Sequence, residues 1–258
     1  MSTPAGYVFD AASQARIQAA EELLDEGTIR LLTRLGVGEG WRCLEVGAGG
    51  GSIACWLGEA VGPTGGVVAT DIDVRALAAR TQPNLEVRQH DVVRDALEES
   101  FDLIHARLLL EHLPEREAIL DKMVAALKSG GWLVIEDVDY VSGVPIGQVG
   151  STEHQRTQAM RLQEFARRGV DSYFGRHLPE RLRARGLVSV GNEGRVWVME
   201  AGSPGARWFK LSLAHLRSQL VGPDLLSDAE VDQMLRLFDE PGFSAFSPII
   251  VGAWGQKP

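Results

Sequence analysis

Hydrophobic positions follow two different periods along the first 140 residues. The first 35 residues show helical spacing, and Gly27 interrupts the apolar series. Beyond them, short apolar runs bounded by turn residues alternate with helical segments. We expect strands over 41–47, 66–72, 85–91, 101–107 and 132–138, and helices over 52–60, 74–80 and 114–128. Strands joined by helical crossovers predict an α/β fold with a parallel sheet and helices on both faces.

This alternation stops after Tyr140. The remaining pattern predicts helices over 151–169, 179–185, 205–221 and 227–239, and strands over 187–190, 195–200 and 248–254. A late strand such as 248–254 often enters a parallel sheet in the antiparallel direction.

Composition narrows the class of partner. The chain has 258 residues and a formal net charge of -9, which argues against a nucleic-acid or anionic-membrane surface as partner. It contains no apolar run of about 18 residues and begins with no basic and apolar leader, so we expect a cytoplasmic protein. Cys43 and Cys55 lie in apolar segments, which favours buried free thiols over a disulfide or a metal pair.

The stretch "EVGAGGGS" from Glu45 to Ser52 ends the first expected strand. Gly47, Gly49 and Gly51 allow the backbone to turn with positive φ or to pass close to a ligand. Their spacing also approaches the dinucleotide fingerprint, so the glycines alone do not choose a ligand. Glu45 distinguishes between the possible ligands, because a carboxylate aimed at the loop would repel a pyrophosphate and suit an ammonium and a sulfonium. S-adenosylmethionine carries both positive charges.

Two further acids follow the next expected strands. Asp71 could accept hydrogen bonds from both ribose hydroxyls of an adenosine cofactor. Asp91 could accept from the adenine amino group, while the Val92 amide donates to a ring nitrogen. Open α/β sheets bind ligands at the carboxyl ends of their strands, where all these residues are expected.

Five stretches in this order resemble the motifs of class I S-adenosylmethionine-dependent methyltransferases: "CLEVGAGGGSIACWL", "VVATDID", "HDVV", "FDLIHARLLLEHLP" and "LKSGGWLVIEDVD". The pattern is similar to the small-molecule enzymes of quinone biosynthesis and of natural-product or secondary metabolism. The resemblance covers about residues 40–140 and names no acceptor. It implies a Rossmann-like, mostly parallel seven-stranded sheet with a helical cap.

The family organisation implies one domain over residues 1–258. Its parts would be an N-terminal helical lid at 1–36, a cofactor-binding core at 40–140, and cap segments at 141–185 and 201–245.

The resemblance also implies roles for single residues. The backbone at Gly47 and Gly49 would lie alongside the methionyl chain, and Ile72 would pack against adenine. The Ala106 carbonyl would accept from the cofactor ammonium. Arg107 would pair with the cofactor carboxylate, or with Glu45 or Glu111 of the chain itself.

Catalytic and substrate residues are less sharply marked. His112 follows the fourth strand at the expected cleft rim, where it is either a general base or a structural residue that binds the loop backbone. His105 lies within the strand and is expected to be a hydrogen-bonded core histidine. Candidate substrate contacts are Tyr7, Tyr140, His154 and Tyr173. Glu136, Asp137 and Asp139 resemble metal ligands, but no acid ends the fourth strand to complete the site, so we expect no metal.

The expected activity is methyl transfer to an oxygen, nitrogen or carbon of a small, partly apolar acceptor. Two alternatives stay open, because a fold does not fix its chemistry. One is a non-methylating reaction such as a cyclisation, and the other is a non-catalytic cofactor-binding subunit. A homodimer is possible.

Overall fold

The structure is a computed structural model that describes residues 11–78, 80–98 and 100–258; the proposed substrate contact Tyr7 lies outside them. The chain forms two compact units. The sheet unit comprises Asp25–Gly143, Phe165–Val196 and Ser247–Pro258. The helical unit comprises the described part of Met1–Leu24, with Val144–Glu164 and Trp197–Phe246. These boundaries place residues 165–185, expected in the cap, with the sheet. One domain with a lid and a cap stays a prediction.

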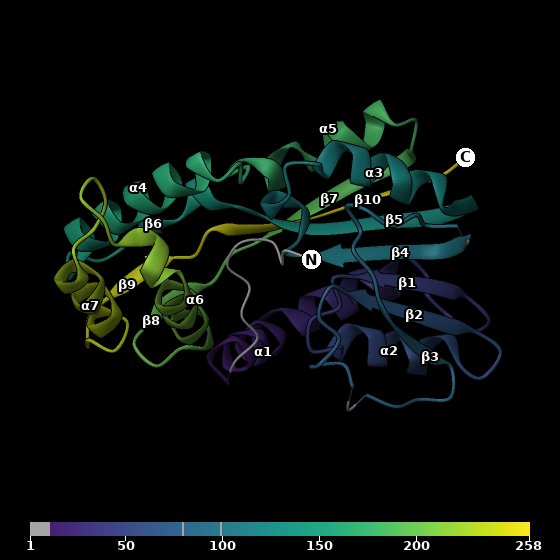
Figure 1. Ribbon diagram of the computed structural model, residues 1–258, viewed down its shortest axis with the longest axis horizontal. Coiled ribbons are helices and arrows are strands. Elements are labelled where there is room, and N and C mark those ends of the chain that lie inside the picture. Colours follow the sequence, from purple (N-terminus) through teal and green to yellow (C-terminus); the bar gives the residue numbers. More distant parts are fainter. Residues whose placement is uncertain (1–10, 79, 99) are drawn as a thin grey trace. The chain divides into compact units, whose positions relative to one another are not determined.

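The sheet unit is built on seven strands in the order β3-β2-β1-β4-β5-β10-β7 (Figure 1). They are β1 Arg42–Val46, β2 Gly66–Asp71, β3 Leu85–Gln89, β4 Phe101–Arg107, β5 Leu127–Asp139, β7 Val188–Arg195 and β10 Ile249–Gln256. Strands β1 to β5 are parallel, and β10 runs antiparallel to both β5 and β7. The seven-stranded, mostly parallel sheet and its antiparallel last strand are therefore confirmed.

Helices cover both faces of this sheet. Figure 1 shows α3 (Arg116–Ala125) and α5 (Phe174–Ala184) on one face, and α2 (Ser52–Val61) on the other. Alternate residues of each strand supply the two apolar cores. Leu44 and Ile104 pack with the α3 and α5 side chains, whereas Cys43 packs with α2. Burial of both strand faces explains why these strands are continuous apolar runs in the sequence.

Helix α5 begins earlier than the sequence predicts. The sequence predicts a helix over 179–185. Proline is common in the first turn of a helix, but Pro179 lies inside a helix that begins at Phe174. A Cβ on Gly175 would come within 2.7 Å of the Asp137 carbonyl oxygen, so glycine lets α5 lie directly on β5. Tertiary packing of Phe174, Leu178 and Leu182 therefore overrides the local proline signal.

Helix α1 (Ala11–Arg34) confirms the helical prediction for the described part of the first segment, and it continues through Gly27, where an added Cβ would overlap the Arg195 side chain. Two other predicted elements differ from the structure. Residues 74–78 form turns in place of a helix, because Leu77 donates only three residues back, to Val74. Helix α3 ends at Ala125, since β5 begins at Leu127, opposite Phe101.

The helical unit contains a second, smaller sheet. Its order is β6-β9-β8, formed by Val144–Pro145, Ser244–Phe246 and Val198–Glu200 in antiparallel pairing. The predicted strand 195–200 is thus divided between two sheets. The helices are α6 (Pro204–Leu220), α7 (Asp228–Leu237) and most of α4 (Ser151–Arg167). Ser227 and Glu230 form a capping box at α7. No helix in the described ranges is long and apolar enough to cross a membrane.

Candidate functional site

The candidate site lies at the carboxyl ends of the parallel strands in the sheet unit. Strand order reverses at β1, which pairs with β2 on one side and β4 on the other. Loops that leave β1 and β4 therefore diverge, and this is the position where open α/β sheets bind ligands. The glycine loop follows β1, Asp71 ends β2, Asp91 follows β3, and a short 3-10 helix, η1 (Leu110–His112), follows β4.

The glycine loop forms a tight cradle between β1 and α2. Gly47, Gly49 and Gly51 all have positive φ, at 69°, 56° and 82°. A Cβ on Gly51 would lie 2.6 Å from Leu77 Cδ2, and one on Gly47 would lie 3.0 Å from Leu109 Cδ2. At Gly47 and Gly51 a side chain is thus disfavoured both by conformation and by space. The bare backbone fits a ligand chain that passes close to it.

Asp71 holds this loop from the neighbouring strand. Its Oδ2 accepts from the Gly49 amide at 2.9 Å, and its Oδ1 accepts from the Asp73 amide at 3.0 Å. Burial raises the pKa of Asp71 above its ordinary value. Each carboxylate oxygen has a second lone pair, so ribose hydroxyls could still donate to it. Asp73 accepts from the Arg75 amide at 3.1 Å in the turn that follows.

Glu45 is buried at the end of β1. Its Oε2 lies 2.6 Å from His105 Nδ1, which belongs to the adjacent residue of β4 in the sheet register. His105 is fully buried, and its Nε2 lies 3.3 Å from Glu136 Oε1. The expectation that His105 is a hydrogen-bonded core histidine is therefore confirmed. Glu45 is held by a side chain on the neighbouring strand.

The proposed adenine contacts lie beside this loop on β2 and β3. Ile72 is 37% exposed, which leaves an apolar surface directly after Asp71. Asp91 Oδ1 accepts from the Val93 amide at 3.0 Å, while the Val92 side chain is buried. The Asp91 carboxylate also lies 3.5 Å from Arg94 Nε. These contacts fix the loop after β3.

The last two residues of β4 have different surroundings. Ala106 is buried within the sheet, between Val46 of β1 and Ile135 of β5. Arg107 donates to Asp25 Oδ1 at 2.7 Å and to Thr28 Oγ1 at 2.9 Å, both on α1. The sequence suggested Glu45 or Glu111 as internal partners of Arg107, and this is wrong. The continuous helix α1 brings a closer carboxylate.

His112 belongs to an aromatic and acidic cluster at η1. Its side chain is 43% exposed, and Nε2 lies 3.4 Å from Oε1 of the fully buried Glu111. The same oxygen accepts from the Tyr140 hydroxyl at 3.0 Å, and Oε2 accepts from the Val138 amide at 2.8 Å. The rings of His112 and Tyr140 are 6.4 Å apart, and Phe165 packs edge-on against both. Two of the proposed functional residues, His112 and Tyr140, therefore share one carboxylate.

Glu111 and Asp137 form a buried acid pair under this cluster. Burial, with each carboxyl close to the other, raises the pKa of Glu111 well above its ordinary value. Burial also raises the pKa of Asp137 from 3.8 to about 6, although the Leu109 and Leu110 amides donate to it at 2.9 and 3.1 Å. The pair therefore keeps a proton at pH values where surface carboxyls have lost theirs.

We expect this pair to make stability fall as pH rises. The folded protein binds the Asp137 proton more tightly than the unfolded chain, so its free energy of unfolding falls between about pH 4 and 7. The fall from Asp137 alone is on the order of 2 kcal/mol. Urea unfolding at both pH values should show a smaller fall in Asp137→Asn than in wild type. The exposed control Asp224→Asn should keep the wild-type slope, and an unchanged slope in Asp137→Asn would contradict the assignment.

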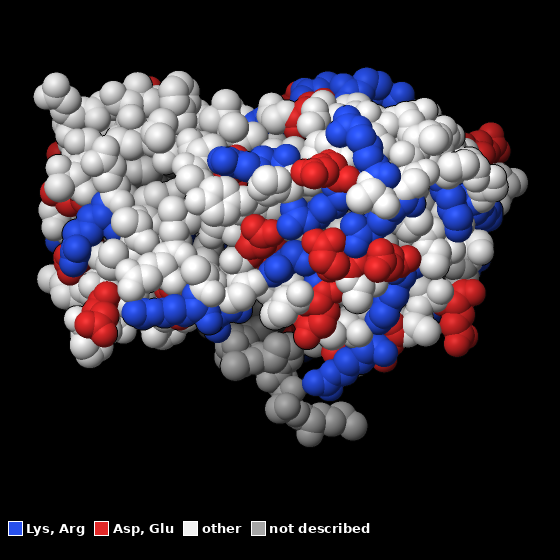
Figure 2. All heavy atoms as spheres, turned by 90° about the horizontal axis from the view of Figure 1, so that it is seen from above, with Lys and Arg blue, Asp and Glu red and all other residues white. Residues whose placement is uncertain are grey.

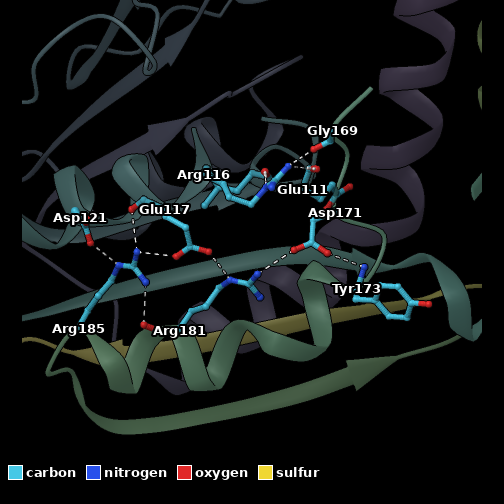
Figure 3. A network of polar contacts seen from close by, with 10 residues as sticks. Glu111, Arg116, Glu117, Asp121, Gly169, Asp171, Tyr173, Arg181 and Arg185 are labelled. Carbon is cyan, nitrogen blue, oxygen red and sulfur yellow. Dashed lines mark hydrogen bonds and ion pairs between the residues drawn. The ribbon is translucent and has the colours of Figure 1, made fainter. Parts of the chain in front are cut away.

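Arginines of α3 and α5 form a polar network beside η1 that the sequence did not reveal (Figure 3). Arg116 donates to the carbonyls of Leu110 and Gly169 and so holds η1 in place. Arg181 donates to Glu117 at 2.7 Å and to Asp171 at 2.9 Å. Arg185 bridges Glu117 and Asp121, and basic and acidic side chains alternate over this face in Figure 2.

The remaining predicted residues lie apart from this cluster or have other partners. Tyr173 is exposed at the start of α5, with Arg176 over its ring. His154 belongs to the helical unit, where burial lowers its pKa to about 4.

The three acids of β5 have separate protein partners: His105 and Arg195 for Glu136, η1 amides for Asp137, and Arg176 for Asp139. Within the described ranges, no group of three metal-ligand side chains is present. Cys43 and Cys55 are free, as predicted, with only Cys43 fully buried.

Comparison with known proteins identifies the family to which the chain belongs. Residues 14–190 match the family described as "Methyltransferase domain". Methyltransferase str2 of Strobilurus tenacellus is 33% identical over 141 residues, 54% of this chain and 50% of that protein. Methyltransferase GfsG of Streptomyces halstedii is 32% identical over 141 residues, 52% and 49% of the two chains. The chain thus spans about half the length of the curated relatives it matches.

A solved structure with the same fold is phosphoethanolamine N-methyltransferase 2 of Haemonchus contortus in complex with S-adenosyl-L-methionine. The two structures have a TM-score of 0.58 at 16% sequence identity, over 99% of this chain and 61% of that one. At this identity the likeness concerns the fold alone.

Proposed function

The chain belongs to the methyltransferase-domain family, as a class I S-adenosylmethionine-dependent member of small-molecule type, and from that premise we propose the reaction it catalyses. The proposed activity is transfer of the methyl group of S-adenosylmethionine to a small, partly apolar acceptor. One observation carries this proposal. Glu45 of β1, the glycine-rich loop that follows it and Asp71 of the adjacent strand β2 lie together at the reversal of strand order.

The residues of this edge suit the parts of the cofactor one by one. Glu45 would face the methionyl end, and the loop through Gly47 and Gly49 would pass its chain. Asp71 would bind the ribose, Ile72 would cover adenine, and Asp91 with Val92 would meet its polar edge. The Ala106 carbonyl remains a proposed acceptor for the ammonium. Arg107 is a weaker candidate for the cofactor carboxylate, since Asp25 and Thr28 already bind its guanidinium.

The cofactor supplies an electrophilic methyl group on a positively charged sulfur. The chain must then hold the acceptor in line and keep water away, and for a hydroxyl or an acidic carbon it must also remove a proton. His112 is the proposed base, because it is the exposed member of a cluster whose other polar groups are buried or hydrogen-bonded. The His112 imidazole would take up the proton beside Glu111. The adjacent acid pair would then stabilise the imidazolium.

A small acceptor fits both the charge and the local surface. The net charge of -9 disfavours nucleic acid, and the aromatic rings of Tyr140 and Phe165 beside His112 favour a partly apolar molecule. Tyr140 is therefore the proposed acceptor contact in this unit, while His154, Tyr173 and Tyr7 remain further candidates. A cytoplasmic location, a homodimer and a place in secondary metabolism remain predictions.

Product analysis tests the proposal. Incubation with methyl-labelled S-adenosylmethionine and a panel of phenols, hydroxyquinones, amines and carboxylic acids should yield labelled product and S-adenosylhomocysteine in equal amounts. An unlabelled, rearranged product would identify a different reaction, such as a cyclisation. Tight cofactor binding without any product across the panel would favour a non-catalytic subunit.

A further inference from the structure

A buried chain of charged groups extends from the proposed cofactor edge across one face of the sheet. It joins Glu45 of β1, His105 of β4, Glu136 of β5 and Arg195 of β7. Glu136 and His105 are fully buried, and the Arg195 side chain is 9% exposed. Burying so many ionisable groups is costly unless each is paired. Here each of the two carboxylates contacts a histidine or an arginine.

The geometry assigns protons to His105. Its Nδ1 lies 2.6 Å from a Glu45 oxygen, and its Nε2 lies 3.3 Å from a Glu136 oxygen. Ionised carboxylates only accept hydrogen bonds, so each ring nitrogen must carry a proton to donate. An imidazolium and a guanidinium then balance two carboxylates, and the buried group has no net charge.

Two glycines make room for the last member. A Cβ on Gly27 of α1 would overlap the Arg195 guanidinium, and one on Gly252 of β10 would lie 3.4 Å from Arg195 Nη2. The arginine therefore lies in a slot between a helix and a strand that both lack side chains at the contact. Burial, with Arg107 and Arg30 nearby, lowers the pKa of Arg195 only to about 10, so it stays charged at neutral pH.

We propose that His105, Glu136 and Arg195 form a positioning relay, which holds the Glu45 carboxylate in the orientation that receives the amino group of the cofactor. This inference rests on the proposed function, because it assigns Glu45 to the methionyl end. Glu45 uses Oε2 for His105, and the relay thereby fixes which way Oε1 points. Only ligands that carry an amino-acid end should depend on it.

The variant Glu136→Gln tests the relay at a distance from the cofactor. It keeps the side-chain volume and an acceptor for His105, but it removes the charge that links His105 to Arg195. We expect S-adenosylhomocysteine to bind roughly tenfold more weakly in calorimetry, the effect of one misplaced charge-assisted hydrogen bond. Binding of 5′-deoxy-5′-methylthioadenosine, which lacks the amino-acid end, should change less than about twofold.

The matched control is Glu193→Gln. Glu193 lies 3.8 Å from Arg195 Nε and 2.9 Å from Arg34 Nη2, so the same chemical change is made at the outer end of the chain of charges. It should leave both affinities at wild-type values. If folded Glu136→Gln binds both ligands equally more weakly, or binds both as wild type does, the relay is overturned. Binding of both ligands by the wild-type protein would still support the cofactor assignment. If wild type itself binds neither ligand, the proposed function fails and the relay with it.

A second measurement does not depend on any ligand or variant. Nitrogen-15 NMR of the wild-type protein at pH 7 should show both ring nitrogens of His105 protonated. A His105 ring with one unprotonated nitrogen would overturn the relay even if the cofactor binds as proposed.

Discussion

Asp71→Ala is expected to weaken S-adenosylmethionine binding at least tenfold, and on the order of a hundredfold, in a protein that still folds. The carboxylate would accept hydrogen bonds from two ribose hydroxyls, and each such charge-assisted hydrogen bond is worth roughly 1.5–3 kcal/mol. The same side chain also holds the glycine loop through the Gly49 amide. Titration calorimetry of wild type and variant, with circular dichroism to verify folding, measures the effect.

Asp73→Ala is the matched control for this change. Asp73 lies two residues further along, and its carboxylate binds Arg75 rather than the loop. Its removal should change cofactor affinity less than about twofold. A folded Asp71→Ala protein with wild-type affinity would place the cofactor elsewhere on the sheet edge.

His112→Ala is expected to lower turnover by at least about a hundredfold while cofactor affinity stays nearly unchanged, provided that the acceptor must lose a proton. The loss should be greatest below the acceptor's own pKa, because above it the acceptor ionises without help. Turnover against pH for wild type and variant on an identified acceptor measures this.

His177→Ala supplies the control, since it removes an exposed histidine from α5 in the same unit. It should retain wild-type turnover. Full activity of His112→Ala over the whole pH range would remove His112 from the mechanism. Weaker cofactor binding or lower stability, with an unchanged shape of the pH profile, would instead assign it the structural role of holding η1.

The central strands of the sheet could be predicted because they are buried on both faces. Mostly apolar runs such as 66–72 and 248–254 are visible without any partner. The acids at strand ends could also be placed, since parallel strands bring their carboxyl ends to one edge. The start of α5 could not be predicted, for the opposite reason. It depends on the strand backbone that lies against the helix at Gly175.

Pairings within the site were beyond the reach of the sequence. That His105 contacts Glu45 follows from the register of β1 on β4, which no local pattern encodes. No sequence pattern around Arg195 predicts its burial. A related feature is a pair of glycines, Gly27 in α1 and Gly252 in β10, which leave space for its side chain. The ion pairs of Arg181 and Arg185 also could not be predicted, because their acidic partners Glu117 and Asp121 lie on a different helix.

The most direct measurement is titration calorimetry of the wild-type protein with S-adenosylmethionine, S-adenosylhomocysteine and NAD under identical conditions. A carboxylate before the glycine loop should admit the positively charged methionyl end and repel a pyrophosphate. We therefore predict micromolar-range binding of both adenosyl ligands and no binding of NAD. Tight binding of NAD, with no response to either adenosyl ligand, would contradict the assignment of this sheet edge to S-adenosylmethionine.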